Sequence, residues 1–224
     1  MRKKREFLRQ RFFQQINRVR MENLRSRISP HFTFNVLGRE INQFNGSEEV
    51  KHNLMELVKY LRRSLELTEK LSVSLQDELD FVRTYIELER GRVGEDFVAT
   101  ITVEDGLDAT RIMIPSMIVQ IPVENAVKHG LEGKDGKKEL MVYVSRETNG
   151  IRITVTDNGR GYLPQVVSAT RGTGTGLKVL YQTIQLLNTK NKSDKIRFNI
   201  TNRSDGQTGT EVSVYIPFRF SYDL

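Results

Sequence analysis

The stretch QIPVENAVKHG, residues 120 to 130, decides the fold of this chain. Its spacing of apolar residues predicts a helix, and Asn125, Lys128 and His129 lie on adjacent turns of it. The amide oxygen of Asn125 is a ligand that suits Mg²⁺, while Lys128 and His129 can neutralise phosphate oxygens. Taken alone, the stretch is better explained as an amphipathic helix with solvated polar residues, so its meaning depends on its neighbours.

A cluster of glycines follows about thirty residues later. Five of the sixteen glycines in the chain fall between residues 159 and 176: Gly159, Gly161, Gly172, Gly174 and Gly176. The cluster opens with DNGRG (157–161) after a predicted strand and closes with GTGTGL (172–177) at the start of a predicted helix. Glycine-rich backbone at a helix N-terminus suits a phosphate group. A flexible loop that happens to be rich in glycine explains the cluster equally well.

Several other kinds of site are excluded. The chain has no cysteine, which rules out disulfides, thiolate metal sites and cysteine nucleophiles. It contains no P-loop motif, and the glycines at 172 to 176 have the wrong spacing for a dinucleotide fingerprint. No apolar run in the 224 residues approaches the roughly 18 that a membrane helix needs.

The pattern from about residue 72 onward predicts an α+β sandwich. Ser74 and Asp77 have capping-box spacing at the start of a helix. Strict alternation then predicts strands of a largely antiparallel sheet with one solvated face at 97–103, 140–144, 151–155, 196–200 and 212–216. Helical patterns from Ser116 to His129 and from Leu177 to Leu187 would cover the other face.

The N-terminal part is predicted to be a helical hairpin. A long amphipathic helix is expected from Arg2 to Phe44, a turn at 45–47 with Ser47 as N-cap, and a second helix that includes Leu54 to Leu65. The two helices of the hairpin have more apolar surface than they can bury against each other, so we expect two copies to form a dimeric four-helix bundle. The predicted domains are 1–70 for the hairpin and 71–224 for the sandwich.

The net charge of +7 comes from one end of the chain. Residues 1–30 contain ten Lys and Arg against two Glu, whereas the other 194 residues are nearly balanced. A uniform nucleic-acid-binding surface is therefore not expected, and no nucleic-acid partner is predicted.

The motif SPHFTFN, residues 29 to 35, offers a nucleophile. The ring nitrogen of His31 can attack phosphorus without a strong base, and Asn35 lies on the same helical face, where it could orient the ring or a phosphoryl oxygen. Pro30 would kink the helix there. The same residues could instead be a helix start capped by Ser29, or a core histidine between two phenylalanines.

The order of these motifs resembles the nucleotide-binding (GHKL, or Bergerat) fold that gyrase, Hsp90, histidine kinases and MutL share. The resemblance implies that Asn125 binds Mg²⁺ and that Asp157 accepts a hydrogen bond from the adenine amino group. It also implies that residues 159–176 form an ATP lid and that Thr210 lies near the adenine. The hydrolysing members place a carboxylate four residues before the magnesium ligand, where this chain has Ile121. A protein nucleophile is therefore favoured over water.

The whole chain resembles the catalytic part of LytS/YehU-type sensor histidine kinases. The family marks are PHFTFN (30–35), YLR (60–62), a helix from Tyr85 to Arg92 in slightly altered form, and VENAVKHG (123–130). Glu124 is normal for this family. Thr33 stands where an aliphatic residue is expected, and Phe32 occupies the position that is acidic in better-known histidine kinases, which leaves any general base open.

The resemblance implies a two-component sensor kinase that uses ATP and Mg²⁺ to phosphorylate His31 and then an aspartate on the receiver domain of a response regulator. His52 and His129 compete with His31 as acceptor but lack its Pro/Asn frame. The basic N-terminus is typical of the cytoplasmic flank of a membrane segment. We therefore expect a homodimer that is the cytoplasmic portion of an inner-membrane protein, anchored upstream of Met1. The alternatives are an ATP-driven clamp or chaperone and a degenerate dimeric scaffold without catalysis.

Overall fold

The computed structural model describes residues 48–162, 175–189, 191 and 193–222. The first helix of the predicted hairpin, with the turn that follows it, lies outside these residues, as does the predicted dimeric bundle. The described elements are α3 (Glu48–Glu69), β1 (Ser72–Ser74), α4 (Leu75–Val93), β2 (Phe97–Val103), β3 (Met113–Pro115), α5 (Gln120–Asn125), η1 (Ala126–Leu131), β4 (Lys138–Glu147), β5 (Gly150–Asp157), α6 (Thr175–Asn188), β6 (Arg197–Asn202) and β7 (Thr210–Pro217).

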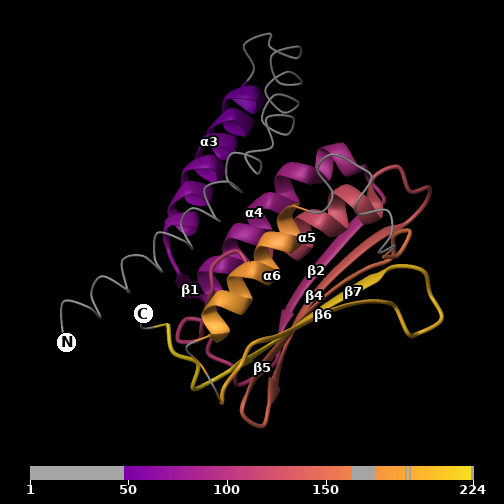
Figure 1. Ribbon diagram of the computed structural model, residues 1–224. Helices are drawn as coiled ribbons and strands as arrows, with labels where there is room; N and C mark the ends of the chain where they lie inside the picture. Colours follow the sequence, from indigo (N-terminus) through magenta and orange to yellow (C-terminus); the bar gives the residue numbers. More distant parts are fainter. Residues whose placement is uncertain (1–47, 163–174, 190, 192, 223–224) are drawn as a thin grey trace.

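The elements form two main layers with one additional helix. Helices α4, α5 and α6 lie together over one face of a five-stranded sheet, and α3 lies against α4 on the side away from the sheet (Figure 1). The predicted α+β sandwich is confirmed. Helix α3 confirms the second helix of the predicted hairpin.

The sheet has the strand order β2-β4-β5-β7-β6. Three of its pairings are antiparallel, as predicted, whereas β2 and β4 are parallel. In β4, Leu140, Val142 and Val144 are buried under the helices, while Met141 and Tyr143 are exposed on the open face. This alternation confirms the prediction of one solvated face.

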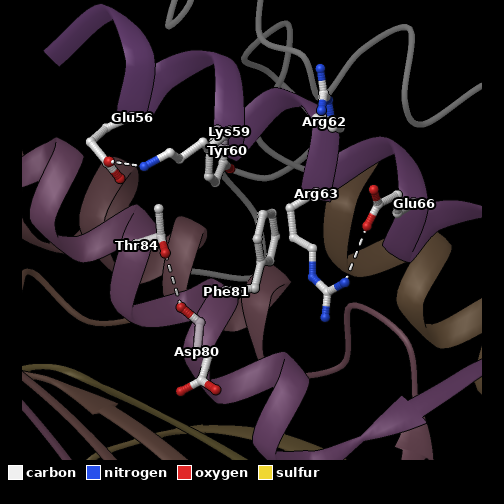
Figure 2. Close-up of a pocket in the computed structure, with 9 residues that line it drawn as sticks. All are labelled: Glu56, Lys59, Tyr60, Arg62, Arg63, Glu66, Asp80, Phe81 and Thr84. Atoms are coloured by element: carbon white, nitrogen blue, oxygen red, sulfur yellow. Dashed lines mark hydrogen bonds and ion pairs between the residues drawn. The ribbon is translucent and has the colours of Figure 1, made fainter. Parts of the chain in front are cut away.

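Helix α3 packs on α4 through residues that recur at helical spacing. Leu57, Tyr60 and Leu67 are buried, and the Tyr60 ring stacks on Phe81 of α4 with centroids 4.9 Å apart. Beside this stack, a groove of about 330 Å³ opens between the two helices (Figure 2). Its lining residues are Glu56, Lys59, Tyr60, Arg62, Arg63, Glu66, Asp80, Phe81 and Thr84.

The start of α4 follows the sequence prediction. The Ser74 side chain accepts a hydrogen bond from the backbone N–H of Asp77 at 3.0 Å, which satisfies a donor that the helix cannot pair. Two short strands were not predicted: β1, directly before α4, pairs with β3 over three residues only, too few for an alternating pattern.

The predicted helix from Ser116 is wrong at its N-terminal end. The backbone turns at Met117, which has a φ of 69°, and α5 begins only at Gln120. The reason is Glu78, a fully buried residue of α4. Its carboxylate accepts backbone hydrogen bonds from Met117 at 2.9 Å, Val119 at 3.0 Å and Gln120 at 3.2 Å. A distant side chain therefore caps this helix.

Within the described part of the chain, no helix has both the length and the hydropathy that crossing a membrane requires.

We expect Glu78→Gln to lower the free energy of unfolding by about 2 kcal/mol, because an amide N–H₂ replaces one oxygen that accepts from the buried backbone. Chemical denaturation measures the loss. Glu87→Gln, which alters an exposed residue of the same helix, should change stability by less than about 0.5 kcal/mol. Equal midpoints for the two variants would contradict the capping role of Glu78.

Candidate functional site

The candidate site lies where the end of β5 meets the start of β7. Asp157 is the last residue of β5 and Thr210 is the first of β7. The Oδ1 atom of Asp157 accepts hydrogen bonds from the backbone N–H of Gly159 at 2.8 Å and of Thr210 at 3.3 Å. The structure thus brings together three predicted site residues that the sequence separates by up to 53 positions.

Asp157 is a buried carboxyl, with 4% of its surface exposed. Burial raises its pKa above the ordinary aspartate value, and the hydrogen bonds from Gly159 and Thr210 oppose this shift. A carboxyl that is buried, oriented on one oxygen and lined by backbone suits recognition of a neutral N–H donor.

Close backbone approach explains the glycines around Asp157. A Cβ atom on Gly130 would lie 2.7 Å from Asp157 Oδ1, one on Gly159 would collide with the Gly130 carbonyl, and one on Gly209 would collide with the Asp157 carbonyl. Gly161 has a φ of +85°, which favours glycine. Gly130 and Gly209 were not predicted as site residues, although Gly130 directly follows the predicted helix that ends at His129.

Asn125 is the last residue of α5 and is half-buried. Its Nδ2 donates to the backbone carbonyl of Ile121 at 2.7 Å, so the side-chain oxygen is the atom left for another partner. An amide oxygen is a ligand that fits Mg²⁺, an ion that also keeps waters and phosphate oxygens in its shell. In the described ranges, no group of three or more acidic or histidine side chains could hold a metal by itself. A magnesium ion here would depend on Asn125 and on the oxygens of its substrate.

Lys128 and His129 lie on η1, the turn of π-helix that follows Asn125. The ammonium of Lys128 is 3.4 Å from the carboxylate of the largely buried Glu124. Partial burial, followed by the charge of Lys128, lowers the pKa of His129. An imidazole with a lowered pKa is neutral near pH 7, so His129 would act as a hydrogen-bond donor rather than as a cation.

Some predicted site residues lie outside the described residues: His31, Asn35, Gly172 and Gly174. Gly176 is described and lies in the first turn of α6, the helix predicted to follow the glycine cluster. Of the predicted set, the structure therefore gathers Asn125, Lys128, His129, Asp157, Gly159, Gly161 and Thr210 on α5, η1 and the adjoining ends of β5 and β7.

Two family models match successive parts of the chain. Residues 19–97 match the model described as histidine kinase. Residues 110–219 match the model described as histidine kinase-, DNA gyrase B- and HSP90-like ATPase.

Curated relatives match most of the chain. The sensor histidine kinase YpdA of Escherichia coli K12 is 28% identical over 202 residues, which are 90% of this chain and 34% of that protein. The sensor histidine kinase/phosphatase LytS of Staphylococcus aureus MRSA252 is 32% identical over 197 residues, which are 84% of this chain and 33% of that protein. The chain thus spans about a third of the length of these relatives.

A solved structure shares the fold. The histidine kinase domain of the blue-light activated histidine kinase EL346 from Erythrobacter litoralis aligns with a TM-score of 0.51 and covers 94% of each chain. The sequence identity is 16%, so this likeness concerns the fold alone.

The raised pKa of Asp157 predicts a pH-dependent loss of stability. The folded protein keeps this proton to a higher pH than the unfolded chain does, so stability is lost as pH rises through the raised pKa. Asp157→Asn keeps an acceptor for both N–H groups and avoids this loss. We expect the variant to gain stability relative to the parent as the pH rises above the ordinary aspartate pKa of about 4, measured by denaturant unfolding at each pH. An exposed aspartate such as Asp105, replaced in the same way, is the control. A relative gain at lower pH instead would refute the prediction.

Proposed function

We propose that this chain, a member of the histidine kinase family, is the phosphoryl-transfer core of a sensor histidine kinase and uses Mg·ATP to phosphorylate its own His31. The match to both family models over successive residues supports this proposal. So does the gathering of Asn125, Asp157 and Thr210 on adjoining elements.

In this proposal Asp157 recognises the adenine. Its carboxylate would accept a hydrogen bond from the purine amino group, and its orientation by Gly159 and Thr210 supports that role. Gly130 and Gly209 let the neighbouring backbone approach Asp157 closely, which restricts where its carboxylate can lie. The buried setting strengthens a single hydrogen bond, since water does not compete for it.

The phosphates would lie along α5 and η1. Asn125 would hold Mg²⁺, which supplies charge neutralisation for the phosphate oxygens when bound. Lys128 would approach the same oxygens as a cation, and the imidazole of His129 would donate a hydrogen bond to them. The backbone N–H groups of Gly172, Gly174 and Gly176, with those of Gly159 and Gly161, would line the lid over them.

The identity of residue 121, an isoleucine, is the observation that favours a protein nucleophile over water. Ile121 stands four residues before Asn125, on the same helix, and is only 4% exposed. An apolar buried side chain cannot activate water there. The nearby carboxylate, Glu124, already contacts Lys128. This arrangement supports kinase chemistry over the ATP-driven clamp.

The reaction is an in-line transfer. A ring nitrogen of His31 would attack the γ-phosphorus, a P–N bond would form, and the P–O bond to ADP would break with ADP leaving. The proton on the other ring nitrogen would then pass to solvent. Asn35, one turn further along the predicted helix, would orient the ring or a phosphoryl oxygen.

For the whole protein, we propose a homodimer that passes the phosphoryl group to an aspartate on the receiver domain of a response regulator. We also propose attachment to the inner membrane through a segment outside this chain. The basic residues of the first thirty positions support this attachment, because they suit the cytoplasmic side of a membrane.

His31→Gln should lose autophosphorylation, because the amide cannot act as a nucleophile. The measurement is labelling with γ-labelled ATP, in which the label must be lost in acid and retained in base, as a phosphoramidate requires. His52→Gln, which changes an exposed histidine of α3, should be labelled like the parent. Undiminished labelling of His31→Gln would refute the acceptor assignment. Steady phosphate release without an acid-labile protein intermediate would favour the clamp instead.

Asn125→Ala should weaken Mg·ATP binding on the order of tenfold, since it removes one ligand contact of about 1.4 kcal/mol. The measurement is calorimetric titration with ATP, with Mg²⁺ present and then chelated. The difference in ATP affinity between the two conditions should disappear in the variant. Asn149→Ala, in the exposed turn between β4 and β5, is the matched control. Binding of Mg·ATP to Asn125→Ala with the parent's affinity would exclude the metal role.

A further inference from the structure

Glu124 lies at the centre of a buried polar contact between three helices. Its Oε1 atom accepts hydrogen bonds from Gln120 Nε2 at 3.0 Å and from the Tyr60 hydroxyl at 3.5 Å. Gln120 Nε2 also lies 3.4 Å from the Tyr60 hydroxyl. The other oxygen, Oε2, faces Lys128 Nζ at 3.4 Å. The two oxygens of the Glu124 carboxylate thus join Tyr60 of α3 and Gln120 of α5 to Lys128, the candidate phosphate-binding residue.

Tyr60 belongs to α3, which lies outside the layer that covers the sheet (Figure 1). Its ring stacks on Phe81 with an interplanar angle of 5° and lies 6.1 Å from the Tyr85 ring. Tyr60 and Phe81 line the groove between α3 and α4 (Figure 2). The position of the Tyr60 hydroxyl therefore depends on how α3 packs against α4.

Arg92 of α4, another cation, pairs with other carboxylates. Arg92 is 2.5 Å from Glu89 through Nε and 2.5 Å from Glu132 through Nη1. Among the residues that the structure describes, Lys128 is thus the cation that pairs with Glu124. Because a carboxylate with two donors on one oxygen cannot rotate without losing them, Oε2 stays directed at Lys128.

We propose that Tyr60 and Gln120 are positioning residues for the nucleotide site: through Glu124 they set the place of Lys128, and they transmit the position of α3 to it. This inference rests on the proposed function, in which Lys128 binds phosphate. A shift of α3 that withdraws the Tyr60 hydroxyl removes one of the two donors that hold Oε1, which leaves Glu124 held by Gln120 alone. The carboxylate can then rotate more easily, and this changes both the pairing of Lys128 and the helix turn that carries Asn125.

The test is a double-mutant cycle with Tyr60→Phe and Lys128→Gln, in which the affinity for Mg·ATP is measured by calorimetry. Tyr60→Phe keeps the ring stacked on Phe81 and removes only the hydroxyl. We expect it to weaken binding roughly three- to tenfold in the parent and to have no further effect in Lys128→Gln, as coupled residues require. Tyr143→Phe, on the open face of β4, is the matched control and should leave binding unchanged.

Multiplicative, independent effects of the two substitutions would overturn the proposal, because a purely structural role of Tyr60 would add to the loss of Lys128. A drop in the unfolding midpoint of Tyr60→Phe with unchanged affinity would overturn it as well.

A second measurement separates this inference from the proposed function. Amide hydrogen exchange of the nucleotide-free protein should be faster at residues 124–129 in Tyr60→Phe than in the parent and in Tyr143→Phe. Unchanged exchange there would overturn the link. Failure of the parent to bind Mg·ATP would instead contradict the proposed function, while the exchange result would still decide whether α3 and the 124–129 segment are joined.

Discussion

The carboxylate of Glu78 is the contact on which the rest of the structure depends. Three backbone N–H groups at the start of α5 lie in the core, where they could not be left without acceptors except at a cost of a few kcal/mol. Glu78 accepts from all three. It thereby stabilises the turn at Met117, determines that α5 begins at Gln120, and so sets the rotation of every later side chain of that helix, including Asn125. It also ties α5 to α4, which Ser74 caps independently.

The other end of the same helical segment is held by the sheet. Gly130, in η1, lies so close to Asp157 that no side chain fits between them, and Gly159 lies against the Gly130 backbone. Single turns of π-helix are often found at functional sites. The third contact, from Tyr60 to Glu124, comes from α3 and is made of long hydrogen bonds. Of the three, it is the weakest and the one that a movement of α3 would change, which makes it suited to regulation.

Local patterns predicted most of the architecture. Alternation identified the five strands of the main sheet, and the spacing of Ser74 and Asp77 identified the start of α4. Two features were missed because they have no local pattern. Strands β1 and β3 are three residues each, and the parallel pairing of β2 with β4 depends on where the chain returns. The error at Ser116 had the same origin, since the residue that prevents a helix there is Glu78, some forty positions away. Gly130 was quoted within the stretch 120 to 130, but its close approach to Asp157, like that of Gly209, is visible only in three dimensions.

The sequence by itself determined the family and the kinds of atoms in the site, because motif order and residue chemistry are properties of the chain: an amide, a carboxyl, glycines and a lysine in a characteristic succession. Only the tertiary structure decided which of these groups touch. It orients Asp157 through Thr210, turns the Asn125 amide nitrogen to Ile121, and pairs Lys128 with Glu124 instead of leaving it solvated. It also brings Tyr60 to Glu124. The contacts of Asp157 with Thr210 and of Tyr60 with Glu124 join residues 53 and 64 positions apart, and they arise from the packing of helices on a sheet, which no local spacing encodes.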